Sequence, residues 1–110
     1  QGTLLYPMPV LETSKSINDK KIAKQLANVL SDRPAALLRA HGTVTVGESI
    51  QDAFVLANYL EENSYRQYMA TAIGQPFVFS KKEIAEFKKR LWTPSLFKKT
   101  WNHFKAKIAP

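Results

Sequence analysis

The sequence predicts one α/β domain in which helices surround a small central sheet and a helical tail follows. Two short apolar runs on either side of His41 and Gly42 are typical of buried strands. Four further segments begin with signals that favour a helix start. The chain has 110 residues, of which 45% are apolar, and these values suit a single domain with its own core.

The first third of the chain is predicted to alternate between extended and helical segments. Residues 1–11 contain few polar side chains and two prolines, which favours extended chain. A helix is expected from the capping-box pattern Ser16-Ile17-Asn18-Asp19 to Asp32-Arg33-Pro34. Strands follow from Ala35 to Leu38 and from Thr43 to Val46. Since two strands do not make a stable sheet, a further strand must come from the first segment or from another chain.

A long helix is predicted directly after these strands. Gly47 makes the turn, Ser49-Ile50-Gln51-Asp52 opens the helix, and Gly74 closes it after about Ala72. Five positions recur at helical spacing and lie roughly on one face of this helix: Ile50, Phe54, Ala57, Leu60 and Ser64.

The tail, residues 81–110, is predicted to form two further helices and to carry the whole charge excess. One begins at Ser80-Lys81-Lys82-Glu83 and ends near Leu91, and the other begins at Thr93-Pro94 and ends near Lys107. Residues 81–110 hold nine basic and two acidic side chains, whereas residues 1–80 hold seven of each. A function that depends on positive charge must therefore involve the tail.

The composition excludes several classes of protein. Cysteine is absent, so disulfides and thiolate chemistry are excluded. No run approaches the ~20 apolar residues of a membrane span, and no signal peptide is visible, so we expect a cytoplasmic protein without membrane contact. Nucleophile-elbow, P-loop and dinucleotide fingerprints are also missing. Because the chain begins at Gln1, we expect it to be processed or to be a piece of a longer protein.

His41 is the residue most suggestive of chemistry. It lies at the end of a predicted strand and next to Gly42, where the strand fixes its position and the glycine admits a ligand. This placement suits a metal ligand, but the residues alone favour a structural histidine hydrogen-bonded at a strand end. One histidine does not make a metal site, so further ligands would have to come from elsewhere.

The segment around His41 resembles the class II aldolase/adducin family, which includes sugar-phosphate aldolases and epimerases and some aromatic-acid decarboxylases. The matching motifs are LLRAHGTVTVG at residues 37–47, DAF at 52–54 and YLEE at 59–62. The family reads LLRNHGVVVVG in this region, so Ala40 stands where the family often has Asn. The resemblance extends from Tyr6 to about Phe87, through a YPMPV lead-in strand and a GQP loop.

The resemblance implies the C-terminal half of a class II aldolase-like α/β/α domain with a mostly antiparallel sheet. Residues 1–80 would belong to this half, and residues 81–110 would be its basic helical tail. The first half of the family's domain normally carries a phosphate-binding loop, an acid/base glutamate and a His-x-His pair, and none of these is present here. The resemblance therefore implies a missing N-terminal half or a companion chain, and a homo-oligomer resembling a tetramer.

The resemblance also implies a divalent metal, most often zinc, held by the His-x-His pair and by a third histidine that matches His41. Three neutral imidazoles with an open coordination position suit a catalytic metal. Such a metal acts as a Lewis acid on a hydroxy-carbonyl and stabilises an enediolate as a C–C bond breaks. Small anionic substrates are implied, either sugar phosphates or hydroxylated aromatic acids. The chain would not be catalytic alone.

The tail offers two weaker candidates for an active site, His103 and Trp101. By the resemblance, tail residues can reach the active site of a neighbouring subunit. The alternative is that Trp101 belongs to an apolar helix stripe of structural residues: Leu96, Phe97, Trp101, Phe104 and Ile108.

Two other functions remain open at this stage. An adducin-like, non-catalytic interaction module would use the same fold and the basic tail to bind partners. Nucleic-acid binding would use the lysines and aromatics of the tail, but the stripe accounts for the aromatics, and a basic rim for an anionic substrate fits better. We therefore expect no nucleic-acid partner.

Overall fold

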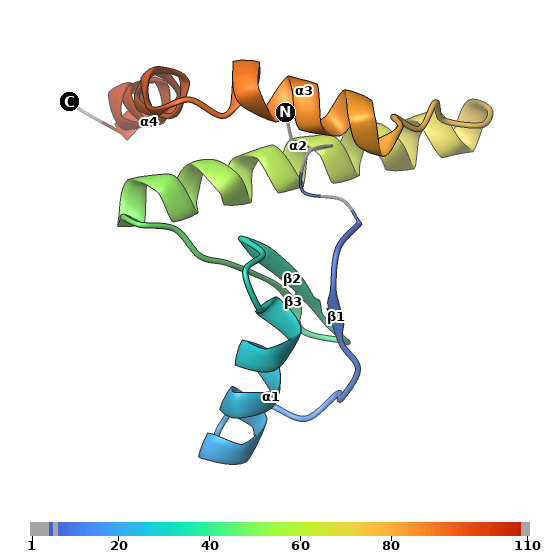
Figure 1. The fold of residues 1–110 in the computed structure, drawn as a ribbon, viewed down its shortest axis with the longest axis vertical. Coiled ribbons are helices and arrows are strands. Elements are labelled where there is room, and N and C mark those ends of the chain that lie inside the picture. The colour runs from blue at the N-terminus through green and yellow to red at the C-terminus, as the bar shows by residue number, and fades with distance from the viewer. Residues whose placement is uncertain (1–4, 6, 109–110) are drawn as a thin grey trace.

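The computed structural model describes residue 5 and residues 7–108, which form a small mixed sheet between helices (Figure 1). The first strand, β1, is Val10–Leu11. The other two are β2, Ala35–Leu38, and β3, Gly42–Thr45. The sheet order is β1-β2-β3, in which β1 runs parallel and β3 antiparallel to β2. The third strand thus comes from the first segment, and the sheet is mixed, with antiparallel pairing in its longer ladder.

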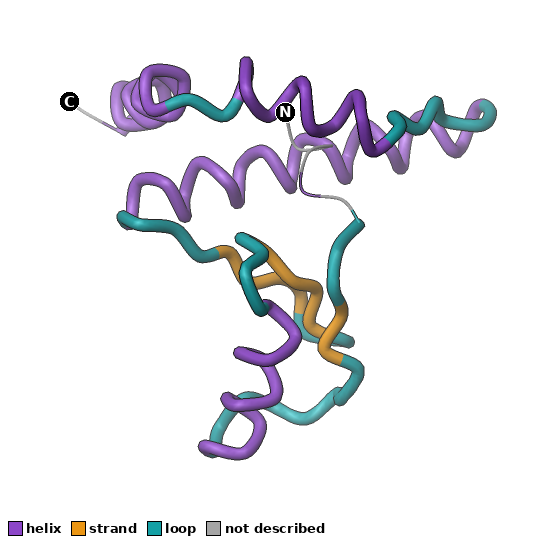
Figure 2. Tube along the Cα trace, viewed as in Figure 1, coloured by secondary structure: helices purple, strands orange, loops and turns teal. Residues whose placement is uncertain are grey.

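Four helices complete the described part of the chain, and Figure 2 shows how they alternate with the strands and loops. They are α1, Lys20–Leu30; α2, Ile50–Ile73; α3, Lys81–Leu91; and α4, Pro94–Ile108. In Figure 1 the sheet lies between α1 and α2, whereas α3 and α4 lie on the side of α2 away from the sheet. The predicted α/β class is confirmed.

Helix starts follow the capping signals, with one correction. The N-cap of α1 is Asp19, whose carboxylate accepts from the backbone N–H of Ile22 at 2.8 Å. The predicted cap at Ser16 is wrong, because residues 16–18 form a separate turn in which Asn18 N–H donates to Ser16 O. Ser80 and Glu83, at the start of α3, make both bonds of a capping box.

The cap of α2 is one-sided. Ser49 Oγ accepts from the backbone N–H of Asp52 at 3.1 Å. The reciprocal hydrogen bond, from the Ser49 N–H to the Asp52 carboxylate, is not formed. Aspartate is one methylene shorter than the Glu or Gln that completes a capping box. Gly47 lies close to this helix start, since an added Cβ would come within 2.8 Å of Asp52 Cβ. Close packing, rather than an unusual φ, therefore requires glycine there.

The main core lies between β2 and α2. It contains Ala35 of β2 with Val55, Leu56, Tyr59 and Leu60 of α2, and Leu5 also belongs to it. Ala36 is fully buried, and successive strand residues face opposite sides of a sheet, so it faces α1. Both faces of the small sheet are therefore covered by helices.

The five positions predicted to share one face of α2 do lie on one helix, but that face is mostly not the one that packs against the sheet. Leu60 is buried, but Ile50 is 81% exposed and Phe54 is 38% exposed. Apolar residues occupy more than one face of the first half of α2, so periodicity alone could not select the face that meets the sheet. Phe54 instead packs edge-on against Trp101 and Phe104 of α4.

Candidate functional site

A tight turn between β2 and β3 positions His41. Leu38 pairs with Gly42, so three residues connect the strands, and His41 N–H donates to Leu38 O at 3.0 Å. Ala40 has φ 62° and Gly42 has φ 121°. Asparagine and glycine tolerate such positive φ values better than alanine does.

The imidazole of His41 is held by the loop that follows β1. Its Nε2 lies 2.7 Å from the carbonyl oxygen of Ser14. Because a carbonyl oxygen only accepts, Nε2 carries the proton and donates, which leaves Nδ1 of the neutral ring with its lone pair. Metal-binding histidines commonly have one ring nitrogen fixed in this way by a carbonyl while the other binds the metal.

A small cavity adjoins the His41 side chain between the end of β1, the loop after it and the β2–β3 turn. Its volume is about 170 Å³, and its lining includes Thr13, Lys15 and Ser16. Nearby, Arg39 of the turn and Glu12 form an exposed ion pair with an N···O distance of 3.4 Å. This ion pair links the turn to the same loop that holds His41.

The chemistry of His41 fits a metal ligand, but as one member of a larger set. Among residue 5 and residues 7–108, no group of three or more His, Cys, Asp or Glu side chains is placed to hold a metal ion. The described residues therefore offer no complete coordination sphere around His41.

The structure does not bring the two tail candidates to His41 within this chain. Trp101 is half-buried against the core, and its ring packs edge-on against Phe54 with centroids 5.4 Å apart. His103 is exposed on the same helix. Figure 1 shows α4 on the far side of α2 from the sheet. Trp101 thus packs as a structural residue of the apolar helix stripe. A role of Trp101 or His103 in the active site of a neighbouring subunit stays a prediction.

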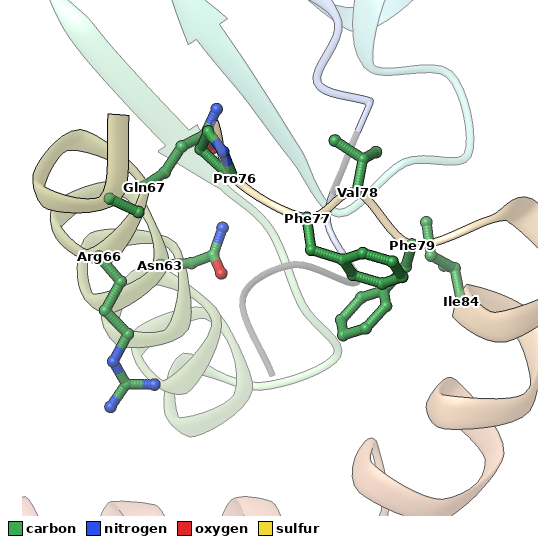
Figure 3. A pocket seen from close by; sticks show the side chains of 9 residues that line it. Asn63, Arg66, Gln67, Pro76, Phe77, Val78, Phe79 and Ile84 are labelled. Atoms are coloured by element: carbon green, nitrogen blue, oxygen red, sulfur yellow. The ribbon is translucent and has the colours of Figure 1, made fainter. Parts of the chain in front are cut away.

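A second cavity, of about 360 Å³, was not predicted from the sequence. Figure 3 shows it between the second half of α2, which supplies Asn63 and Gln67, and the loop before α3, which supplies Phe77 and Phe79. The Phe77 and Phe79 rings lie edge-to-face with centroids 5.5 Å apart. The sequence feature that could have indicated this cavity is the pair of phenylalanines flanking a valine in the predicted loop, because solvated loops rarely carry such an apolar run.

Comparison with known proteins identifies the family of the chain. Residues 3–68 match the family described as the Class II Aldolase and Adducin N-terminal domain. The chain belongs to this family, as its resemblance around His41 predicted.

Two kinds of relative carry enzyme names. A 44-residue stretch is 50% identical to the 3-oxo-tetronate 4-phosphate decarboxylase of Escherichia coli, in strains K12 and CFT073, and covers 40% of this chain and 19% of that enzyme. A 71-residue stretch is 27% identical to the 3,4-dihydroxyphthalate decarboxylase of Rhodococcus jostii RHA1, and covers 64% of this chain and 29% of that enzyme. The chain thus spans less than a third of the length of these relatives.

No helix in the described part of the chain combines the length and apolar character that crossing a bilayer requires.

Proposed function

We propose that this chain is part of a metal-dependent lyase of the decarboxylase type, and that it forms the C-terminal half of a class II aldolase-like domain. Its family and the names of its relatives support a lyase. The observation that carries the proposal is the imidazole of His41, fixed through Nε2–H by Ser14 O in the motif shared with the family.

In this proposal, His41 is the third ligand of a divalent metal, most often zinc. A His-x-His pair would supply the other two, from the rest of a longer polypeptide or from a companion chain, in an oligomer resembling a tetramer. When bound, the metal supplies a Lewis acid that withdraws electron density as a C–C bond breaks. The chain itself supplies a rigid turn that holds the imidazole and its tautomer.

The proposed substrates are small anionic hydroxy-carbonyl compounds or hydroxylated aromatic acids. Each of the two substrates named for the relatives carries two acidic groups, a carboxylate with a phosphate or two carboxylates. The nine basic side chains of residues 81–110 would raise the local concentration of such anions.

The test begins with the native assembly, purified from cells and examined by mass spectrometry for the polypeptide that bears the His-x-His pair. Release of CO₂ is then measured from 3-oxotetronate 4-phosphate and from 3,4-dihydroxyphthalate, before and after metal removal by chelation. We expect release from one of these classes, a loss of at least about 100-fold on chelation, and recovery with zinc, because metal-assisted steps depend on the ion. Unchanged CO₂ release after complete metal removal would sink the metal-dependent mechanism.

A second candidate is a non-catalytic, adducin-like interaction module. The observation that favours it is the exposure of large apolar side chains on the second half of α2, where Tyr68 is 74% and Ile73 is 91% exposed. An assembly that contains neither metal nor a companion chain would support this module over the lyase.

A further inference from the structure

We infer that the cavity beside His41 is a subsite for an oxyanion, the phosphate or carboxylate group of a small ligand, with Lys15 supplying the positive charge. The inference deepens the proposed function, on which it rests for the identification of that ligand as a substrate. The oxyanion chemistry itself stands on the residues of the cavity.

The size of the cavity suits one acidic group with a few attached atoms. Its volume of about 170 Å³ equals that of about five or six waters in the liquid, at ~30 Å³ each. Its walls come from the end of β1, the loop after β1 and the β2–β3 turn, so a ligand would contact three parts of the fold at once.

The polar lining favours an anion. Lys15 brings an ammonium group, and Thr13 and Ser16 bring hydroxyls, while none of the described lining residues is acidic. Thr13 Oγ1 already accepts from the backbone N–H of Lys15 at 3.2 Å, so its own hydroxyl hydrogen remains to donate to a ligand. Lysine acts on phosphate as a point charge and needs no fixed bidentate geometry.

The apolar lining strengthens this preference. Leu11 is only 4% exposed, and together with Leu38 it lines the cavity from the sheet side. This apolar wall keeps water from one side of the cavity, while Lys15 on the other side is exposed. Glu12, an acidic side chain of the same loop, is paired with Arg39.

The location connects the cavity to the proposed metal ligand. The backbone of the loop that carries Lys15 also supplies the carbonyl of Ser14, which accepts from His41 Nε2. An oxyanion on Lys15 would therefore lie beside His41, with one acidic end of a two-acid substrate held next to the proposed reacting centre.

The test is a titration of the chain with inorganic phosphate at low ionic strength, followed by backbone amide NMR. We expect saturable shifts at Thr13, Lys15 and Ser16. Lys15→Gln should weaken phosphate binding by about tenfold, as loss of a charge-assisted contact predicts, whereas Lys15→Arg should bind phosphate nearly as well as the parent chain. Lys20→Gln, on the exposed first turn of α1, is the matched control and should change little.

Equal phosphate affinity in Lys15→Gln and the parent chain would overturn the subsite, as would equal weakening by Lys20→Gln, which would indicate general charge attraction. Zinc titration of the Lys15→Gln assembly separates this result from the metal proposal, because Lys15 is not a proposed ligand. Unchanged zinc binding with weakened phosphate binding supports the subsite. If Lys15→Gln weakens phosphate binding and the assembly binds no zinc, the result supports the oxyanion site and refutes the metal centre.

Discussion

Ala40 holds a backbone conformation that L residues usually avoid. Its φ of 62° lies in the left-handed region, where a residue with a Cβ loses roughly 1–2 kcal/mol. It precedes His41 in the turn that Leu38 O and His41 N–H close. The conformation of one alanine therefore sets the position of the candidate ligand.

Ala40→Gly should raise the free energy of unfolding by about 1 kcal/mol, because glycine adopts positive φ without steric conflict. Urea denaturation measures the change. Ala57→Gly, on an exposed position inside α2, is the control and should lower the stability by roughly 1 kcal/mol, since glycine is unfavourable within a helix. Destabilisation by both variants would show that residue 40 does not hold the left-handed conformation.

At the scale of elements, α4 is attached to α2 mainly through aromatic side chains. Trp101 and Phe104 pack edge-on against Phe54, and Phe97 packs against Tyr59 with ring centroids 5.7 Å apart. The Tyr59 hydroxyl also lies 3.2 Å from Thr100 Oγ1. The aromatic side chains of α4 thus pack against α2. The positive charge of the tail lies on its lysines and Arg90.

Trp101→Ala should lower the free energy of unfolding by about 2 kcal/mol, which is below the roughly 3–5 kcal/mol for a fully buried Trp because Trp101 is only half-buried. Thermal or urea unfolding followed by circular dichroism gives the value. His103→Ala, two residues along the same helix and exposed, should change the stability by less than about 0.5 kcal/mol. A Trp101→Ala variant as stable as the parent chain would contradict the packing role.

Local signals predicted the elements better than the contacts between them. The strand Ala35–Leu38 agrees residue for residue, and Pro94 begins α4 as its sequence indicated. These features depend on neighbouring residues alone. The buried face of α2 and the cavity formed with Phe77 depend on which distant segments meet, and a periodicity analysis does not contain that information.

At the candidate site, too, local sequence predicted the residue but not its distant contacts. The sequence singled out His41, but its partner, Ser14 O, is 27 residues away and contributes only backbone. No side-chain motif could have indicated it. Lys15 was missed for a related reason, because only the pairing of β1 with β2 brings the loop after β1 to the turn.

At the scale of the whole molecule, the chain is a basic unit whose charge is concentrated in its last two helices. The net charge is +7, and residues 1–80 are balanced. The chain also spans less than a third of the length of its curated relatives. Its function is therefore best tested in the assembly proposed above, where the remaining proposed ligands would be present.

The most direct test of the account is the metal content of that purified assembly, measured per chain by elemental analysis, for the parent protein, His41→Ala and His103→Ala. We predict about one divalent metal per chain in the parent and in His103→Ala, and loss of the metal in His41→Ala, as removal of one of three protein ligands requires. Full metal occupancy in His41→Ala would contradict the account and would return His41 to the structural role of a histidine bonded at a strand end.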